Sequence, residues 1–171
     1  SKDKNISGYP VRIPSIDIST IGAGGGSIAW VDNGGILKVG PQSAGAEPGP
    51  ACYARGGTEA AITDARVVLG HLNNKELLNG QLPIDSSLSF KAVEKLSEKI
   101  GMNVEETARG IITVGNSNIV KEIKNVTVEK GYNPSDFALV AFGGAGPLHA
   151  AELMEELSMP MSIIPKTPGL L

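Results

Sequence analysis

The order of apolar patterns along the 171-residue chain predicts an α/β fold. Near the C-terminus an apolar run, a glycine-rich turn, a helical pattern and a second apolar run follow one another, which is typical of a βαβ unit with parallel strands. In the middle of the chain, apolar residues recur at helical spacing over long segments. Near the N-terminus two β-prone runs flank Asn33-Gly34, a strong short-range signal for a hairpin.

Residues 1–60 are expected to form a β and loop region. They hold 12 of the 22 glycines and 5 of the 11 prolines, so these residues gather in one segment and do not mark a low-complexity chain. The hairpin strands are expected over 27–32 and 36–40. The Gly- and Pro-rich stretch 41–57 is too long for a plain connector, which makes it a candidate functional loop.

Residues 61–136 are expected to be mainly helical. Thr63 or Asp64 is predicted to cap a short helix over 65–72. Asp64 is also a candidate catalytic or metal-positioning carboxylate, because a carboxylate beside a functional loop suits either task.

Two longer helices follow. The first, over 89–100, is expected to end at the glycine after it. Asn103 with Glu106 resembles a capping box at the start of the second helix. That helix carries a long apolar stripe and is expected to run to about Lys130, before Gly131.

Residues 137–171 are predicted to form the βαβ unit. The run 137–142 is apolar throughout, as expected of a strand buried on both faces of a parallel sheet. Pro147 suits the first position of a helix that runs to about Leu157. Residues 161–164 are the second strand.

Gly143, Gly144, Ala145 and Gly146 follow the first of these strands and open the helix. Open α/β sheets bind ligands at this position, and free backbone N–H groups with the helix dipole favour an anion there. The segment is neither a P-loop nor a dinucleotide motif, whose third glycine position is His149 here. A nucleotide site and a tight turn without a ligand both fit this segment. His149 is correspondingly a candidate ligand contact or a structural hydrogen-bonding group.

Gly24, Gly25 and Gly26 form a second candidate anion site. Consecutive glycines lose much backbone entropy on folding and need a structural reason. A nest of N–H groups facing a ligand is one reason, and a flexible hinge is the other.

Five further polar residues are candidates for chemistry or binding. Cys52 has no histidine near it in sequence to activate it, so a small buried thiol is favoured over a nucleophile. Arg55 suits a phosphate or carboxylate partner as well as a surface salt bridge. Asn116, Asn118 and Lys121 lie within a helix, where asparagine is disfavoured, so they are either ligand contacts or part of a solvated face.

Composition argues against several classes of protein. A net charge of −3 and a pI of about 5.4 argue against a nucleic-acid-binding surface. No apolar run reaches the roughly 18 residues that a membrane helix needs. One cysteine fits a reducing, cytoplasmic compartment, and two histidines make a compact zinc site improbable, so no metal ligand is predicted.

Four blocks of the sequence resemble the hydantoinase A/oxoprolinase family. They are 17–32 (DISTIGAGGGSIAWVD), 39–57 (VGPQSAGAEPGPACYARGG), 63–72 (TDARVVLGHL) and 137–150 (FALVAFGGAGPLHA). The blocks are spread over nearly the whole chain, and each is more specific than a lone glycine motif. Members of this family include ATP-dependent N-methylhydantoinases, 5-oxoprolinases and the β-type subunits of acetone carboxylases.

The resemblance implies a fold similar to actin/hexokinase/Hsp70-type ATPases, with ATP in a cleft between two α/β halves. It implies an ATP- and Mg²⁺-dependent hydrolase of cyclic amides such as hydantoin or 5-oxoproline, in which a carbonyl oxygen is phosphorylated. Gly143–Gly146 would lie on the adenosine side and Gly24–Gly26 near phosphate or substrate. Asp64 is then a candidate catalytic residue, and Arg55 and His149 are candidate substrate contacts.

The two phosphate motifs of the family, of the Asp-x-Gly-Gly-Thr type, do not occur in this sequence. We therefore expect residues 1–171 to be a single partial domain from the centre and C-terminal part of a longer chain, inactive by itself. The chain ends, Ser1-Lys2-Asp3 and Leu170-Leu171, favour the same interpretation. The alternatives are a subunit of an ATP-dependent ketone carboxylase, a non-catalytic domain that pairs with a B-type subunit through loop 41–57, and a generic mononucleotide-binding domain.

Overall fold

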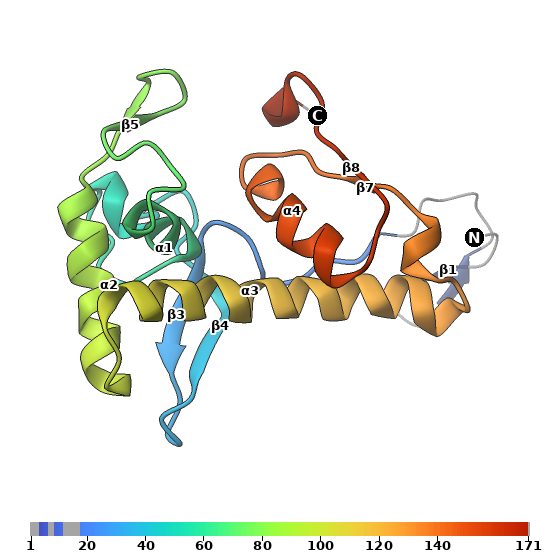
Figure 1. Cartoon of the computed structure of the whole chain (residues 1–171), viewed down its shortest axis with the longest axis horizontal. Coiled ribbons are helices and arrows are strands. Elements are labelled where there is room, and N and C mark those ends of the chain that lie inside the picture. Colours follow the sequence, from blue (N-terminus) through green and yellow to red (C-terminus); the bar gives the residue numbers. More distant parts are fainter. Residues whose placement is uncertain (1–3, 7–8, 12–17, 171) are drawn as a thin grey trace.

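A long helix, α3 (Val104–Thr127), runs through the molecule, and the other elements are arranged along it (Figure 1). The computed structural model describes residues 4–6, 9–11 and 18–170. Asp17, which begins the first family block, and the chain ends Ser1–Asp3 and Leu171 lie outside the described residues. In the part of the chain that is described, no helix is long and apolar enough to cross a membrane.

The predicted hairpin is present and antiparallel. Its strands are β3 (Ser27–Val31) and β4 (Leu37–Ser43). Asp32 shapes the turn, because its Oδ1 accepts hydrogen bonds from the backbone N–H groups of Gly34 and Ile36, both at 2.9 Å.

The segment predicted as a loop over 41–57 is partly regular. Its first three residues continue β4, and Ala51–Tyr53 form a 3₁₀ turn. The expected loop boundary was therefore wrong at its start, since strand pairing extends past Pro41 to a pair between Ser27 and Ser43.

The first helix, α1 (Ile62–Val68), begins before the segment 65–72 in which it was expected. The prediction that Thr63 or Asp64 caps it was wrong, because both lie inside the helix and Ala61 occupies the cap position. Asp64 instead lies in the first turn of α1, where its Oδ2 accepts a hydrogen bond from the N–H of the cap residue Ala61 at 2.9 Å.

The end of the first long helix and the N-cap of the second agree with the sequence pattern, whereas the predicted start of the first was wrong. Helix α2 (Ser86–Ile100) begins before position 89, where it was expected, because Asp85 caps it there. It ends at Gly101 as predicted, and the φ of 69° at this glycine is left-handed. At the start of α3, Asn103 Oδ1 accepts a hydrogen bond from the Glu106 N–H at 2.8 Å. A 3₁₀ turn over Val128–Lys130 follows α3 and ends at Gly131, as expected.

The βαβ unit is confirmed. β7 (Leu139–Val140) and β8 (Ser162–Ile163) are parallel, and α4 (Gly146–Glu156) connects them. The prediction of a strand buried on both faces was wrong: Val140 is 49% exposed and Phe142 is 52% exposed. The reason is that one face alone is covered: Leu139 packs against the core residues Leu153 and Leu157, while Val140 points to the opposite face of the strand.

Two hydrophobic cores lie along α3. The first half of α3 packs against α1, α2 and the β3–β4 hairpin, and the second half packs against α4 and β7. Full burial of one such aliphatic side chain contributes about 1.5–3 kcal/mol, so α3 holds the two groups of elements together. The buried members include Val93, Ala108 and Ile111 in the first core and Val120, Leu153 and Leu157 in the second.

The fold class, α/β with a hairpin, long helices and a βαβ unit, is therefore confirmed. The proposed division at residues 60 and 136 stays a prediction. Four short strands were not predicted: the pairs β1 (Lys4–Ile6) with β2 (Tyr9–Val11) and β5 (Glu76–Leu77) with β6 (Leu82–Pro83), both antiparallel. Short 3₁₀ turns complete the structure at Pro134–Asp136 and Pro168–Leu170.

Candidate functional site

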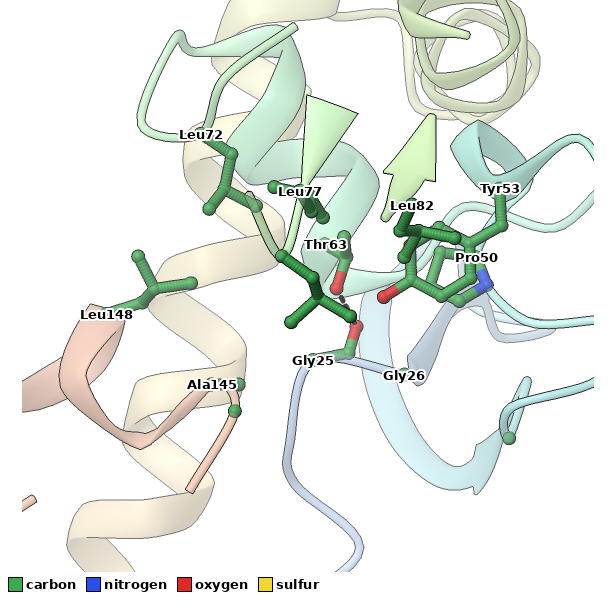
Figure 2. A pocket seen from close by; sticks show the side chains of 13 residues that line it. Gly25, Gly26, Pro50, Tyr53, Thr63, Leu72, Leu77, Leu82, Ala145 and Leu148 are labelled. Atoms are coloured by element: carbon green, nitrogen blue, oxygen red, sulfur yellow. Dashed lines mark hydrogen bonds between the residues drawn. The ribbon is translucent and has the colours of Figure 1, made fainter. Parts of the chain in front are cut away.

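A cavity of about 380 Å³ lies where the two predicted glycine-rich segments meet (Figure 2). Gly25 and Gly26 line one side, and Gly144 and Ala145, just before α4, line the other. Apolar side chains form most of the remaining wall, and we call this cavity the leucine pocket. Its lining includes Pro50, Tyr53, Thr63, Leu72, Leu77, Leu82 and Leu148.

Gly25 is held firmly at the base of the leucine pocket. Its carbonyl oxygen accepts hydrogen bonds from the Thr63 backbone N–H at 2.9 Å and from the Thr63 hydroxyl at 2.8 Å, and Figure 2 shows the second bond. A Cβ atom at position 25 would lie 2.9 Å from Thr63 Oγ1 and 3.2 Å from Ala145 Cβ. The glycine is therefore needed for a close approach, and a flexible hinge at Gly25 does not fit this geometry.

The backbone N–H groups around this contact are candidate anion donors. Those of Gly25, Gly26, Gly144 and Ala145 donate to no other described residue. At Gly144 a Cβ atom would meet nothing within 4 Å, so the backbone there borders open space. Unpaired N–H groups beside the N-terminus of a helix favour a negatively charged ligand.

A second cavity, of about 240 Å³, adjoins the first, and Ala145 lines both. Gly24, Gly146 and His149 also line this second cavity, which we call the histidine pocket. The two glycine segments thus contribute to both cavities. The other lining residues include Ile119, Ile123, Leu139, Phe142 and Leu153.

A polar network joins α1, α3 and α4 behind the histidine pocket. Arg66 donates to Glu152 through two nitrogens, at 3.0 and 2.7 Å, and its Nη1 lies 3.0 Å from His71 Nδ1. Asn116 Nδ2 donates to Glu152 Oε2 at 3.2 Å, and Asn116 Oδ1 lies 2.6 Å from His149 Nδ1. Arg66 and His149 are each only 3% exposed.

This network determines which nitrogen of His149 carries the proton. A carboxylate only accepts hydrogen bonds, so the amide nitrogen of Asn116 must face Glu152 and its oxygen must face His149. His149 Nδ1 is therefore the protonated donor, and in the neutral imidazole Nε2 is an acceptor. His149 Nε2 is buried and has no partner among the described residues.

The charges of the network favour this neutral form. Burial, reinforced by the nearby Arg66 guanidinium, lowers the pKa of His149 below 6.5. The hydrogen bond from Arg66 lowers the pKa of Glu152 below its usual value, so this carboxylate is ionised near neutral pH. Near neutral pH the network therefore combines a cation, an anion and a neutral imidazole.

Asp64 lies outside both pockets and is fully buried. Its carboxylate accepts hydrogen bonds from the N–H groups of Ala51, Cys52 and Ala61 at 2.9–3.1 Å and from the Ser89 hydroxyl at 2.7 Å. This set ties the 51–53 turn to α1 and α2. A catalytic role for Asp64 stays a prediction, while its geometry favours a structural role.

Cys52 is also fully buried. Burial, with the adjacent Asp64 carboxylate, raises the pKa of Cys52 to about 12. The thiol is therefore protonated at physiological pH, which agrees with the structural interpretation of this residue.

The remaining candidates lie apart from the two pockets. Arg55 is exposed and lines neither of them, so its substrate role stays a prediction. Asn118 and Lys121 line a separate cavity of about 490 Å³ with Trp30 and Lys38, and Asn118 Nδ2 donates to the Val39 carbonyl at 3.1 Å. Among the described residues, no group of three or more His, Cys, Asp or Glu side chains is placed to hold a metal ion.

Sequence reasoning missed three parts of the site. The leucines of the β5–β6 segment form a pocket wall, which was missed because two-residue strands leave almost no pattern in a sequence. Thr63 was considered as a helix cap only. The Arg66–Glu152 pair spans 86 positions, so no local spacing rule finds it.

Comparison with known proteins places these features in a family. A family profile for hydantoinase/oxoprolinase matches residues 1–171. The caprolactamase alpha subunit of Pseudomonas jessenii is 45% identical over 167 residues, which are 97% of this chain and 24% of the relative. 5-Oxoprolinase 1 of Arabidopsis thaliana is 36% identical over 99% of the chain and 14% of the relative. The chain thus spans a quarter or less of the length of these relatives.

Two solved structures share the fold. The ATP-dependent caprolactamase from Pseudomonas jessenii superposes with a TM-score of 0.89 at 44% identity, covering 98% of this chain and 24% of that one. The nucleotide-free structure of an acetone carboxylase, from work on ATP-dependent acetone carboxylation, has a TM-score of 0.86 at 29% identity with the same coverage.

Proposed function

The chain belongs to the hydantoinase/oxoprolinase family, and from this premise we propose that it is part of an ATP-dependent hydrolase of cyclic amides. In this proposal the 171 residues contribute the adenosine-side wall of the ATP cleft. The chemistry that ATP supplies is activation of an amide oxygen by phosphoryl transfer. Residues beyond these 171 are needed for the reaction, because the chain covers a minor part of its relatives.

One observation carries the proposal: the leucine pocket brings Gly25 and Gly26 together with Gly144 and Ala145. The residues present fit a nucleotide. Unpaired N–H groups suit phosphate oxygens, and the apolar wall with Tyr53 suits the flat face of a base. A volume of about 380 Å³ lies within the range of small-molecule sites, roughly 300–1,000 Å³.

The residues present do not fit a Mg²⁺ site. Magnesium takes carboxylate oxygens together with water and phosphate oxygens, and neither the leucine pocket nor the histidine pocket is lined by an Asp or Glu side chain. We therefore propose that any protein ligand to the ion lies outside the lining of these two pockets. The partner subunit of the B type and the cytoplasmic location are part of the same proposal, and the buried free thiol of Cys52 supports a reducing compartment.

A second candidate function is a subunit of an ATP-dependent ketone carboxylase. The likeness to the acetone carboxylase structure favours it, at 29% identity. The likeness to the caprolactamase structure, at 44% identity, favours the hydrolase.

The experiment that separates the two is ADP release by the full-length protein. Hydantoin, 5-oxoproline and ε-caprolactam are compared with acetone plus bicarbonate, and a reaction without added substrate is the control. The proposal expects release above the control with at least one cyclic amide and none with acetone. Release that depends on acetone and bicarbonate would establish the carboxylase instead.

A further inference from the structure

One ion pair connects the two helices that contribute side chains to the leucine pocket. Arg66 of α1 donates to both carboxylate oxygens of Glu152 of α4, at 3.0 and 2.7 Å. The Arg66 side chain is 3% exposed and that of Glu152 is 43% exposed. A two-point bond between a planar guanidinium and a carboxylate fixes the orientation of the two groups as well as their distance. The Arg66–Glu152 pair therefore constrains how α1 and α4 lie relative to each other.

The Arg66–Glu152 pair lies one turn from the leucine pocket on each helix. Thr63 of α1 and Leu148 of α4 both line this pocket, and Figure 2 shows their side chains. Arg66 is at i+3 from Thr63 and Glu152 is at i+4 from Leu148, spacings that place two side chains on the same face of a helix. A change in the distance between Arg66 and Glu152 is therefore transmitted directly to the lining of the pocket.

The apolar cores join α1 and α4 to α3 and not to each other. Ile62 and Ala65 of α1 belong to the first core and Leu153 of α4 to the second, and among the described residues the two cores have no member in common. At Gly115 of α3 a Cβ atom would lie 2.7 Å from Ile62 Cδ1, so α1 and α3 approach closely there. Apolar packing thus leaves the distance between α1 and α4 to be set by other contacts.

Asn116, the next residue of α3, makes the corresponding contact with α4. Its Nδ2 donates to Glu152 Oε2 at 3.2 Å, and its Oδ1 accepts a hydrogen bond from His149 Nδ1 at 2.6 Å. The three helices therefore form a triangle. Packing joins α1 to α3, Asn116 joins α3 to α4, and the Arg66–Glu152 pair is the side that joins α4 to α1.

On the basis of the proposed function, we propose that Arg66 and Glu152 are positioning residues for nucleotide binding. The pair holds Gly25 on one side of the leucine pocket at a fixed distance from Ala145 on the other. Both glycine segments are then in place before the nucleotide arrives, so binding costs less conformational entropy. Neither Arg66 nor Glu152 lines the pocket, so the pair acts through the two helices and not by touching the nucleotide.

A purely structural role of the pair is the alternative, and the choice of variants has to separate the two. Removal of Glu152 alone leaves the buried charge of Arg66 without a partner, which destabilises the fold in either case. Arg66→Lys keeps the charge but loses the two-point geometry. The double variant Arg66→Met/Glu152→Gln removes both charges together and leaves Asn116 an acceptor, so the largest penalty of a broken pair is avoided.

The test measures binding of a non-hydrolysable ATP analogue to the full-length protein by calorimetry. Titrations are made well below the melting temperature of each variant, so that lower stability alone does not reduce the affinity. Arg109→Lys and Glu155→Gln are the matched controls. They make the same kinds of change on α3 and α4, at exposed positions that line neither pocket.

Hydrogen–deuterium exchange of the same proteins without nucleotide is the second measurement. A positioning role predicts faster exchange in the segments 24–26 and 143–148 of both Arg66 variants. The amides of α2, which lines neither pocket, are expected to exchange as in the wild type. A role in general stability predicts faster exchange in α2 as well.

We expect Arg66→Lys and the double variant each to bind the ATP analogue about fivefold or more weakly than the wild type. The two controls are expected to bind it as the wild type does. If the double variant fails to fold, Arg66→Lys decides the question, because it keeps the charge balance of the pair.

The outcomes separate this proposal from the proposed function. Wild-type affinity in folded Arg66 variants overturns the positioning role alone, and so does weaker binding with faster exchange throughout α2. A wild type that does not bind the ATP analogue overturns the proposed function, and with it any role of the pair in nucleotide binding.

Discussion

The carbonyl oxygen of Gly25 accepts hydrogen bonds from both the backbone N–H and the hydroxyl of Thr63, at 2.9 and 2.8 Å. This double contact ties the N-terminal glycine segment to the first turn of α1. It also sets the distance between that segment and Ala145 on the other side of the leucine pocket. The relative position of the two glycine segments therefore depends in part on one threonine.

Thr63→Val is expected to weaken nucleotide binding severalfold and to lower stability by about 1 kcal/mol, because it removes one hydrogen bond and keeps the shape of the side chain. The measurement is calorimetric titration of an ATP analogue into the full-length protein, with a melting curve. Thr63→Ser keeps the hydroxyl and is the matched control. Equal affinities in the valine and serine variants would show that this contact does not position the nucleotide site.

Gly144→Val is expected to reduce affinity for the ATP analogue by about tenfold or more. A Cβ atom at position 144 meets nothing within 4 Å, so the added side chain enters the leucine pocket without disturbing the fold. The control is Gly169→Val, because Gly169 also borders open space and lines neither pocket. Unchanged affinity in Gly144→Val would exclude this segment from the nucleotide site.

Asp64→Asn is expected to lower stability by about 3 kcal/mol, because an NH₂ group replaces an oxygen that accepts hydrogen bonds from buried donors. The same change loosens the turn that contains Cys52. Melting curves and iodoacetamide labelling of Cys52, followed by mass spectrometry, measure both effects. In the wild type the thiol, with its pKa raised to about 12, stays unlabelled.

A different result for Asp64→Asn would support the catalytic role predicted from the sequence. That role requires loss of activity at an unchanged melting temperature and with Cys52 still protected. Asp64→Glu is a useful companion, because it keeps the charge but misplaces the oxygens.

The pH dependence of stability is expected to reveal the neutral state of His149. Its pKa is lowered by burial, so below about pH 6.5 the unfolded chain takes up a proton that the folded chain does not. The stability that the folded protein has with His149 neutral is fully present above about pH 6.5. It is lost as the pH falls through the lower pKa that His149 has in the folded protein. Glu152, whose pKa is lowered from 4.5, acts in a separate window below pH 4.5.

The measurement is the difference in melting temperature between the wild type and His149→Asn from pH 5 to pH 8. We expect this difference in melting temperature to be constant above about pH 6.5. At lower pH we expect the melting temperature of the wild type to fall relative to that of His149→Asn. A difference that does not change with pH would show that His149 titrates normally in the folded protein.

Local signals predicted much of the fold. The hairpin, the end of α2 at Gly101, the cap of α3 and the βαβ unit depend on residues within a few positions of one another, such as Asn103 and Glu106. The start of α1 was missed because an aspartate near a helix start looks in sequence like the cap residue. Asp64 instead lies in the first turn, and its carboxylate accepts a hydrogen bond from the N–H of the cap residue Ala61. The apolar run 137–142 was expected to be buried because a sequence does not show whether other elements cover both faces of a strand.

The candidate site could be predicted in its glycine segments and at His149. Consecutive glycines are visible in a sequence and indicate a special backbone requirement. The structure confirms that the two segments meet, because Gly25 and Ala145, far apart in sequence, line one pocket. The pairing of Arg66 with Glu152 and the tautomer of His149 depend on contacts between α1, α3 and α4. Such contacts arise from helix packing, which no local pattern specifies.

We propose that this chain serves an enzyme that opens cyclic amides with ATP. The most direct measurement is the stoichiometry of the full-length protein, together with any subunit it needs, in a reaction with ATP and 5-oxoproline or ε-caprolactam. ADP and the ring-opened amino acid are quantified in the same sample. We predict both products in equal amounts and neither product without the other. Release of ADP without ring opening, or a carboxylated ketone product in its place, would contradict it.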